Sequence, residues 1–174
     1  MKLQGLSDRA ISRIAKTVLE DEGRLLTMTL QEFINEPVEG FRYDPNLLYE
    51  ANANTSDLIT LGSGFFNLHP EGRKHVLGHE KAHYFVDYLQ STMPDFWDVL
   101  WSLVDEGAFG KKYEDGTIDG INGQFTPIEN LTEAVIVYFE EPKWLDENYP
   151  RAYAFVSSMM RPHGLSGATV RRVA

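Results

Sequence analysis

The chain has no cysteine among its 174 residues, and it is short of basic residues. Without thiols, disulfides and thiolate metal sites are excluded, so any bound metal must be held by histidine and carboxylate groups. The 16 Lys and Arg residues stand against 26 Asp and Glu, which gives a formal net charge of −10. Because no basic stripe exists to neutralise phosphates, we expect no nucleic-acid partner.

Long apolar runs are also missing. No segment approaches the roughly 18 apolar residues of a membrane span, and residues 1–7 lack the apolar core of a signal peptide. We therefore expect a soluble protein with no membrane span. It would be cytoplasmic, or secreted or injected as part of a larger protein.

The hydrophobic content of 43% and aromatic content of 12% are enough for one core in a chain of this length. We expect a single domain over residues 1–174. Its expected parts are an N-terminal helix and sheet over about 1–69, a motif helix over about 70–90, a helical half over about 94–160 and a tail over 161–174.

The first 69 residues predict one helix and a small sheet. Ser7 can N-cap a helix whose apolar residues recur at helical spacing as far as about residues 20–23. We expect a mostly antiparallel sheet, with Leu58–Leu61 as its edge strand. Three or four short strands are predicted from runs rich in β-forming residues at 24–28, 41–43, 47–51 and 58–61.

Prolines mark the starts of the helices expected in the rest of the chain. Pro70 begins a helix whose apolar positions continue to about Gln90. Further helical stretches are expected over 95–104, 126–139 and 142–160, with a glycine-rich loop over 107–124. The core side of the helix over 95–104 is expected to consist of Phe96, Trp97, Leu100 and Trp101.

The helix that begins at Pro70 contains the motif H-E-x-x-H, with His79, Glu80 and His83. Residues four apart lie on one helix face about 6 Å apart along the axis, so the two imidazoles can bind one zinc ion. Glu80 is positioned to take a proton from a water that attacks a carbonyl. With five His and fifteen Glu, chance matches to this motif are expected at roughly 0.01 per chain.

The other histidines fit the site less well. His75 and His83 would be about 12 Å apart along the helix axis, too far to share an ion with bonds of about 2 Å. We read His75 as a residue of the first turns of the helix, and His69 and His163 as loop residues. For His163 a less favoured alternative stays open, in which the C-terminal tail brings its side chain to the metal site.

A catalytic zinc ion needs a third protein ligand and an open position for water. Glu129 and Glu133 lie four apart on the helix that starts at Thr126 and Pro127, so they share one face. We favour Glu129 as the ligand and Glu133 as a partner that orients His79 or His83. In the alternative, Glu129 only completes a capping box with Thr126, and Glu133 is the ligand.

These motifs resemble one family, the gluzincin-type metallopeptidases related to the catalytic domain of anthrax lethal factor, which include the Pro-Pro endopeptidases. The likeness spans about residues 58–160. In that family the first glutamate of the E-x-x-x-E pair is the metal ligand, which implies Glu129. The resemblance rests on Phe65-Phe66, on H-E-x-x-H followed by Asp87-Tyr88, on the segment Glu129 to Ala134, and on the segment Pro150 to Phe155.

The same family has a tyrosine seven residues before the glutamate ligand, where it helps to stabilise the tetrahedral intermediate. This chain has Asn122 at that position, which departs from the family pattern. Tyr113, in the same loop, is a candidate substitute.

Together these features predict an α+β, zincin-like fold, with a small sheet packed on the motif helix and a helical C-terminal half. The predicted function is that of a zinc-dependent endopeptidase with a peptide or protein substrate and Glu80 as the general base. Three alternatives stay open at this point. The first is a zinc-binding pseudoenzyme or interaction module, and the second is a zinc hydrolase of a non-protein amide. The third is a purely structural domain in which the motif is accidental.

Overall fold

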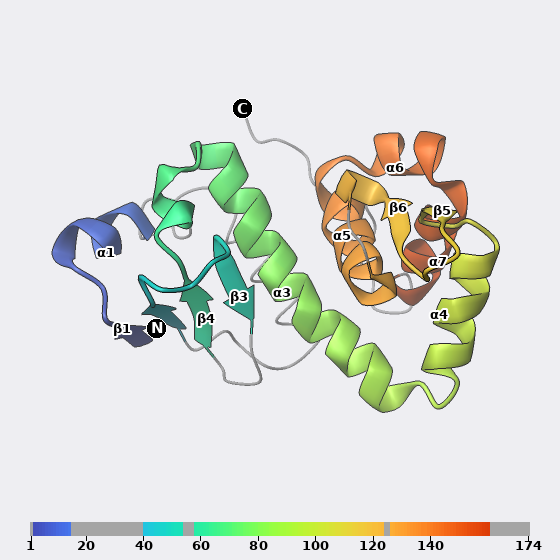
Figure 1. Cartoon of the computed structure of the whole chain (residues 1–174), viewed down its shortest axis with the longest axis horizontal. Helices are drawn as coiled ribbons and strands as arrows, with labels where there is room; N and C mark the ends of the chain where they lie inside the picture. The colour runs from blue at the N-terminus through green and yellow to red at the C-terminus, as the bar shows by residue number, and fades with distance from the viewer. Residues whose placement is uncertain (1, 15–39, 54–57, 124–125, 161–174) are drawn as a thin grey trace. The chain divides into compact units, whose positions relative to one another are not determined.

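The computed structural model describes residues 2–14, 40–53, 58–123 and 126–160. The expected strand at 24–28, the end of the first helix and the tail after Met160 lie outside these ranges. The chain forms two compact units, residues 1–85 and residues 86–174 (Figure 1). Each unit is described in turn.

The first unit is a small α+β structure. Ser7 accepts a hydrogen bond from the Ala10 backbone N–H at 3.4 Å, which agrees with the expected N-cap. The long helix α3 begins at Pro70, as predicted, and its last turns belong to the second unit. The elements in chain order are β1 (Lys2–Gln4), α1 (Asp8–Ile14), β2 (Gly40–Tyr43), β3 (Ala51–Ala53), β4 (Leu58–Leu61), the 3-10 turn η2 (Gly64–Asn67) and α3 (Pro70–Thr92).

The sheet formed by the described strands is mixed, with the order β1-β2-β4-β3. β1 pairs with β2, and β2 with β4, in parallel, whereas β3 and β4 are antiparallel. The expectation of a mostly antiparallel sheet is therefore wrong. β3 and β4 follow one another and pair antiparallel, but β2 and β3 do not pair, because β4 lies between them in the sheet and runs parallel to β2.

The prediction that β4 is the edge strand is also wrong, because β3 covers that side. All four residues of β4 are buried, three of them apolar and the fourth Thr60, so the strand is covered on both faces. The sheet packs on α3 through a core of buried side chains, with Val76 and Tyr84 of α3 at its margin. The buried members of this core are Phe41, Ala51, Ile59, Leu61, Phe65 and Leu77.

The second unit is mainly helical, and its α5 packs against both α6 and α7. The segment expected as a glycine-rich loop contains a two-stranded antiparallel hairpin. Pro150 divides the expected final helix into two. The elements are α4 (Phe96–Asp105), β5 (Gly110–Lys112), β6 (Ile118–Gly120), the 3-10 turn η3 (Ile121–Gly123), α5 (Pro127–Glu140), α6 (Pro142–Asn148) and α7 (Pro150–Met160).

Helix α4 corrects the expectation for two tryptophans. Its buried residues Phe96, Leu100 and Val104 recur every four positions and form one stripe. Trp97 and Trp101 follow the first two by one residue, which turns them about 100° away around the helix. They are 45% and 41% exposed, so they do not belong to the core.

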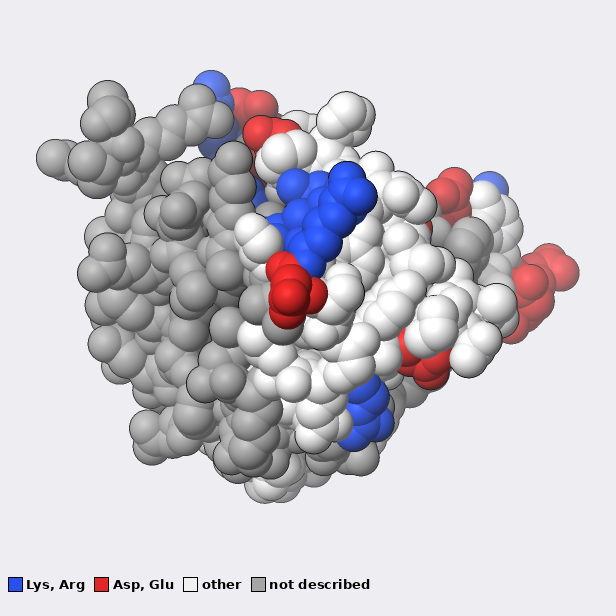
Figure 2. All heavy atoms as spheres, turned by 90° about the vertical axis from the view of Figure 1, so that its left-hand side faces the viewer, with Lys and Arg blue, Asp and Glu red and all other residues white. Residues whose placement is uncertain are grey.

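The described part of the surface carries both signs of charge. In Figure 2, the coloured basic and acidic side chains lie close together among uncharged ones. Among the described residues, no helix is both long enough and apolar enough to span a membrane.

Candidate metal centre

Helix α3 carries the residues of the H-E-x-x-H motif. Its buried side includes Leu77, Ala82 and Phe85, which fix the rotation of the helix against its surroundings. His79 and His83 are only half-buried. Their ring centroids lie 5.0 Å apart with an interplanar angle of 81°. The two imidazoles therefore share one partly accessible face of the helix.

Glu80 differs from the two histidines because it is 8% exposed. Its Oε2 atom accepts a short hydrogen bond from the backbone N–H of Ala53, on the edge strand β3. A carboxylate that accepts a backbone N–H is held in a defined position. Sequence reasoning missed this partner, because a main-chain donor on a strand 27 residues away leaves no sequence signal.

Helix α5 begins as its sequence predicts. Thr126 has an extended backbone, with φ −121° and ψ 153°, and its Oγ1 accepts the Glu129 backbone N–H at 3.2 Å. Asn130 donates from Nδ2 to the Thr126 carbonyl at 2.9 Å, which adds a second bond at the same end. The cap therefore uses the backbone of Glu129. Its side chain belongs to the group described next.

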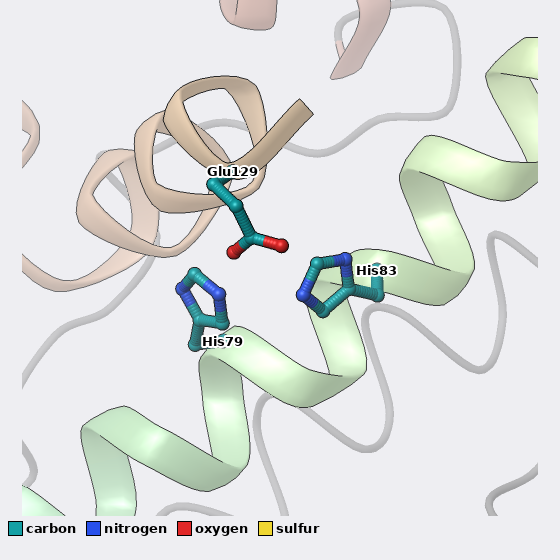
Figure 3. A group of neighbouring side chains, drawn as sticks. All are labelled: His79, His83 and Glu129. Atoms are coloured by element: carbon teal, nitrogen blue, oxygen red, sulfur yellow. The ribbon is translucent and has the colours of Figure 1, made fainter. Parts of the chain in front are cut away.

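His79, His83 and Glu129 each offer a ligand atom, and these atoms all lie within 4.8 Å of one another. Figure 3 shows the Glu129 carboxylate directed toward the two imidazoles. All three side chains are half-buried. The group thus unites the three residues that the sequence singled out as ligands, and it could bind a metal ion.

The donor set suits zinc, which is commonly bound by two imidazoles and one carboxylate in catalytic sites. Ligand atoms about 2.0–2.1 Å from a tetrahedral ion are roughly 3.3 Å apart. The separations of up to 4.8 Å therefore need side-chain adjustments of about an ångström. The residues present fit the ion that the sequence predicted.

Glu133 lies one turn beyond Glu129 and is 1% exposed. Among the described residues it is not a member of the metal-binding group. A buried carboxylate must be hydrogen-bonded or paired, so Glu133 is suited to a supporting role.

Two other polar residues bear on the site. Lys81, inside the motif, is 6% exposed, and burial lowers its pKa to about 8. Its position between two candidate ligands, on a helix with a buried side, is the sequence signal that could have indicated this burial. His75 is half-buried and does not belong to the metal-binding group of the described residues, as expected, and His69 is exposed.

The candidate oxyanion donor Tyr113 lies next to β5 and is 41% exposed. Its hydroxyl donates to Asp119 Oδ2 at 3.3 Å, and the charge of that carboxylate raises the pKa of Tyr113. The hydroxyl is thus engaged within its own hairpin. Asn122, at the position where the family has tyrosine, lies in η3.

No family model matches the chain, and no curated protein or solved structure matches it.

Proposed function

We propose that the chain is a zinc-dependent endopeptidase with a zincin-like fold. His79, His83 and Glu129 would hold the ion, and Glu80 would be the general base. The observation that carries the proposal is the group of three ligand atoms within 4.8 Å of one another, with Glu80 adjacent in sequence to the first of them. The zincin-like fold is supported by the packing of the sheet on α3 and by an antiparallel strand at the edge nearest Glu80.

Zinc, when bound, polarises a carbonyl as a Lewis acid and makes a nearby water more acidic. Glu80 takes one proton from the attacking water as the oxygen bonds to the scissile carbonyl carbon. The same carboxyl group then gives that proton to the leaving amine as the C–N bond breaks. The second proton of the water passes from the new carboxylic acid to the amine. One water and one peptide bond thus become one carboxylate and one ammonium group, so no further reactant is needed.

Glu80 has a second contact that supports this role. The Ala53 N–H keeps one oxygen of the carboxylate in place, and the other oxygen is the one proposed to act as the base. A base fixed in this way loses less conformational entropy when it reaches the reactive geometry.

The substrate is proposed to be an extended peptide that adds to the edge of β3 that none of the described strands covers. Gly62 donates its N–H to the Glu50 carbonyl at 2.8 Å, so the position opposite Gly62 is a hydrogen-bonded pair. Such pairs alternate along an antiparallel ladder. Ala51 and Ala53 therefore direct their N–H and C=O groups away from β4. The Ala53 N–H donates to Glu80, so the groups with which a peptide can pair are the N–H and C=O of Ala51 and the C=O of Ala53.

Metal analysis combined with peptide digestion tests the proposal. The purified chain should bind about one zinc ion, and a peptide library should be cleaved with zinc and left intact after chelation. A zinc content well below one per chain under metal-replete conditions would contradict the site. Zinc binding without cleavage would favour a pseudoenzyme, and cleavage of muropeptides alone would favour a hydrolase of non-protein amides.

A further inference from the structure

The loop between β2 and β3 presents two large apolar side chains to solvent. Leu48 is 94% exposed and Tyr49 is 67% exposed. Apolar side chains exposed singly need no explanation, whereas neighbouring ones can contribute to an apolar surface on which a partner can pack. We call Leu48 and Tyr49 the apolar platform.

The backbone under the platform is fixed by hydrogen bonds at both ends. Asp44 donates its N–H to the Leu61 carbonyl at 3.0 Å, and Gly62 donates to the Glu50 carbonyl at 2.8 Å. Within the loop, the Leu47 N–H donates to the Asp44 carbonyl at 3.2 Å. The two side chains are therefore exposed on a loop whose backbone is held by hydrogen bonds.

Gly62 shows how closely this loop approaches the end of β4. A Cβ atom on Gly62 would lie 2.2 Å from the Tyr49 carbonyl oxygen, which no side chain can tolerate. Only glycine therefore lets the chain cross here. The platform is held by its backbone while its side chains are left to solvent.

The platform leads directly into the strand that faces Glu80. Tyr49 comes two residues before Ala51 and four before Ala53, whose N–H donates to Glu80. At about 3.3 Å per residue, Tyr49 lies up to about 13 Å along the edge from the reacting position. That distance corresponds to about four residues of an extended peptide.

We propose that the apolar platform selects substrates with a large apolar side chain three to five residues C-terminal to the scissile bond. This inference rests on the proposed function. Antiparallel pairing is slightly the more stable mode, and it places the residues after the scissile bond alongside Ala51 and then Tyr49. The platform covers the apolar side chain there, while the exposed carboxylate of Glu50 disfavours an acidic one.

Three peptides test the proposal with the zinc-loaded full chain. The first has leucine four residues after the scissile residue, the second has serine there, and the third has its leucine four residues before it. The first should be cleaved with a kcat/KM about 10-fold above that of the second, because it buries part of a leucine side chain. The third should show no such gain over the second.

Two double variants then test whether Leu48 and Tyr49 cause that preference for leucine. In Leu48→Ser/Tyr49→Ser, the ratio between the first and second peptides should fall to about one. In Leu48→Met/Tyr49→Phe, which keeps the apolar surface, the ratio should stay near 10-fold. A ratio that the serine variant leaves unchanged, or an equal preference for leucine before the scissile bond, would overturn the platform.

The outcomes separate this inference from the proposed function. If no peptide is cleaved, the endopeptidase proposal fails, and the platform is tested by fluorescence anisotropy of the same labelled peptides with the same full chain. The first peptide should then bind about 10-fold more tightly than the second, and the serine variant should remove that difference. Equal binding of the two peptides would overturn the platform.

Discussion

Helices α3 and α5 each carry two candidate ligands four residues apart, yet the two pairs differ in what they join. On α3, both His79 and His83 are half-buried, and both belong to the metal-binding group. On α5, Glu129 belongs to the group, whereas Glu133 is 1% exposed and does not. Spacing therefore identifies a shared helix face, but burial decides which members of the pair join a group that could hold one metal ion.

The position along each helix explains the difference. His79 and His83 lie in the middle of a 23-residue helix, where both are half-buried. Glu129 is in the first turn of α5, where the Thr126 cap leaves its side chain at the half-buried margin. Glu133 lies within the stretch from Asn130 to Phe139, in which every residue is buried.

The first prediction tests whether α3 supplies the base as well as two ligands. Glu80→Gln should leave zinc bound while lowering peptide hydrolysis by about 100-fold to 10,000-fold, because the ligands remain and the base is lost. The glutamine oxygen can still accept the Ala53 N–H. Zinc content and kcat/KM are measured on the same preparation, and wild-type activity in this variant would refute the mechanism.

The second prediction concerns the symmetry of the α3 pair. His79→Ala and His83→Ala should each abolish the gain in thermal stability that zinc gives the wild-type chain, since the metal binds only the folded state. At a zinc concentration 100 times Kd that gain is about 2.7 kcal/mol, or about 5–10 °C in Tm for a chain of this size. Equal wild-type Tm values with zinc and with chelator would contradict an occupied site.

The same two helices show what the sequence could and could not predict. The boundaries of α3 and the N-cap of α5 follow from local signals, namely Pro70, Thr126 and Pro127. The candidate ligands could be predicted because residues four apart lie on one face of a helix. The order of the sheet could not be predicted, because each strand has only three or four residues. In addition, β2 pairs with β4 although β3 lies between them in the sequence.

The exposure of two tryptophans was also predicted wrongly. Trp97 and Trp101 have the helical spacing of a core pair, and their size favoured burial, but the stripe one residue earlier fills the core. The hydrogen bond from Ala53 to Glu80 could not be predicted from the sequence either. It depends on which edge of β3 is not paired with another described strand.

The third prediction concerns the asymmetry of the α5 pair. Glu129→Ala should nearly empty the site at modest zinc concentration, because it removes a ligand. Glu133→Ala should be milder, with zinc affinity or activity lower by about 10-fold to 100-fold, as is usual for a residue that orients a ligand. Zinc affinities from competition with a chelator give the ranking, and the reverse order would assign the ligand role to Glu133.

Glu129→Gln refines that comparison. An amide oxygen can still accept a hydrogen bond at the helix start but is a poor zinc ligand. We expect this variant to lose zinc nearly as fully as Glu129→Ala. Normal zinc content would mean that Glu129 serves the helix and not the metal.

The last prediction separates the cap of α5 from its ligand. Thr126→Ala removes the side-chain acceptor of the Glu129 N–H and should lower the free energy of unfolding by about 1 kcal/mol. The loss should be the same with chelator and with saturating zinc, because the cap bonds to the backbone of Glu129 and not to its carboxylate. Thr126→Ser keeps the acceptor and is the matched control, with stability close to wild type. Denaturant unfolding of the three proteins in both conditions provides the comparison. A Thr126→Ala loss that appears only with zinc would mean that the cap acts by positioning the ligand, and the two roles of this first turn would then be coupled.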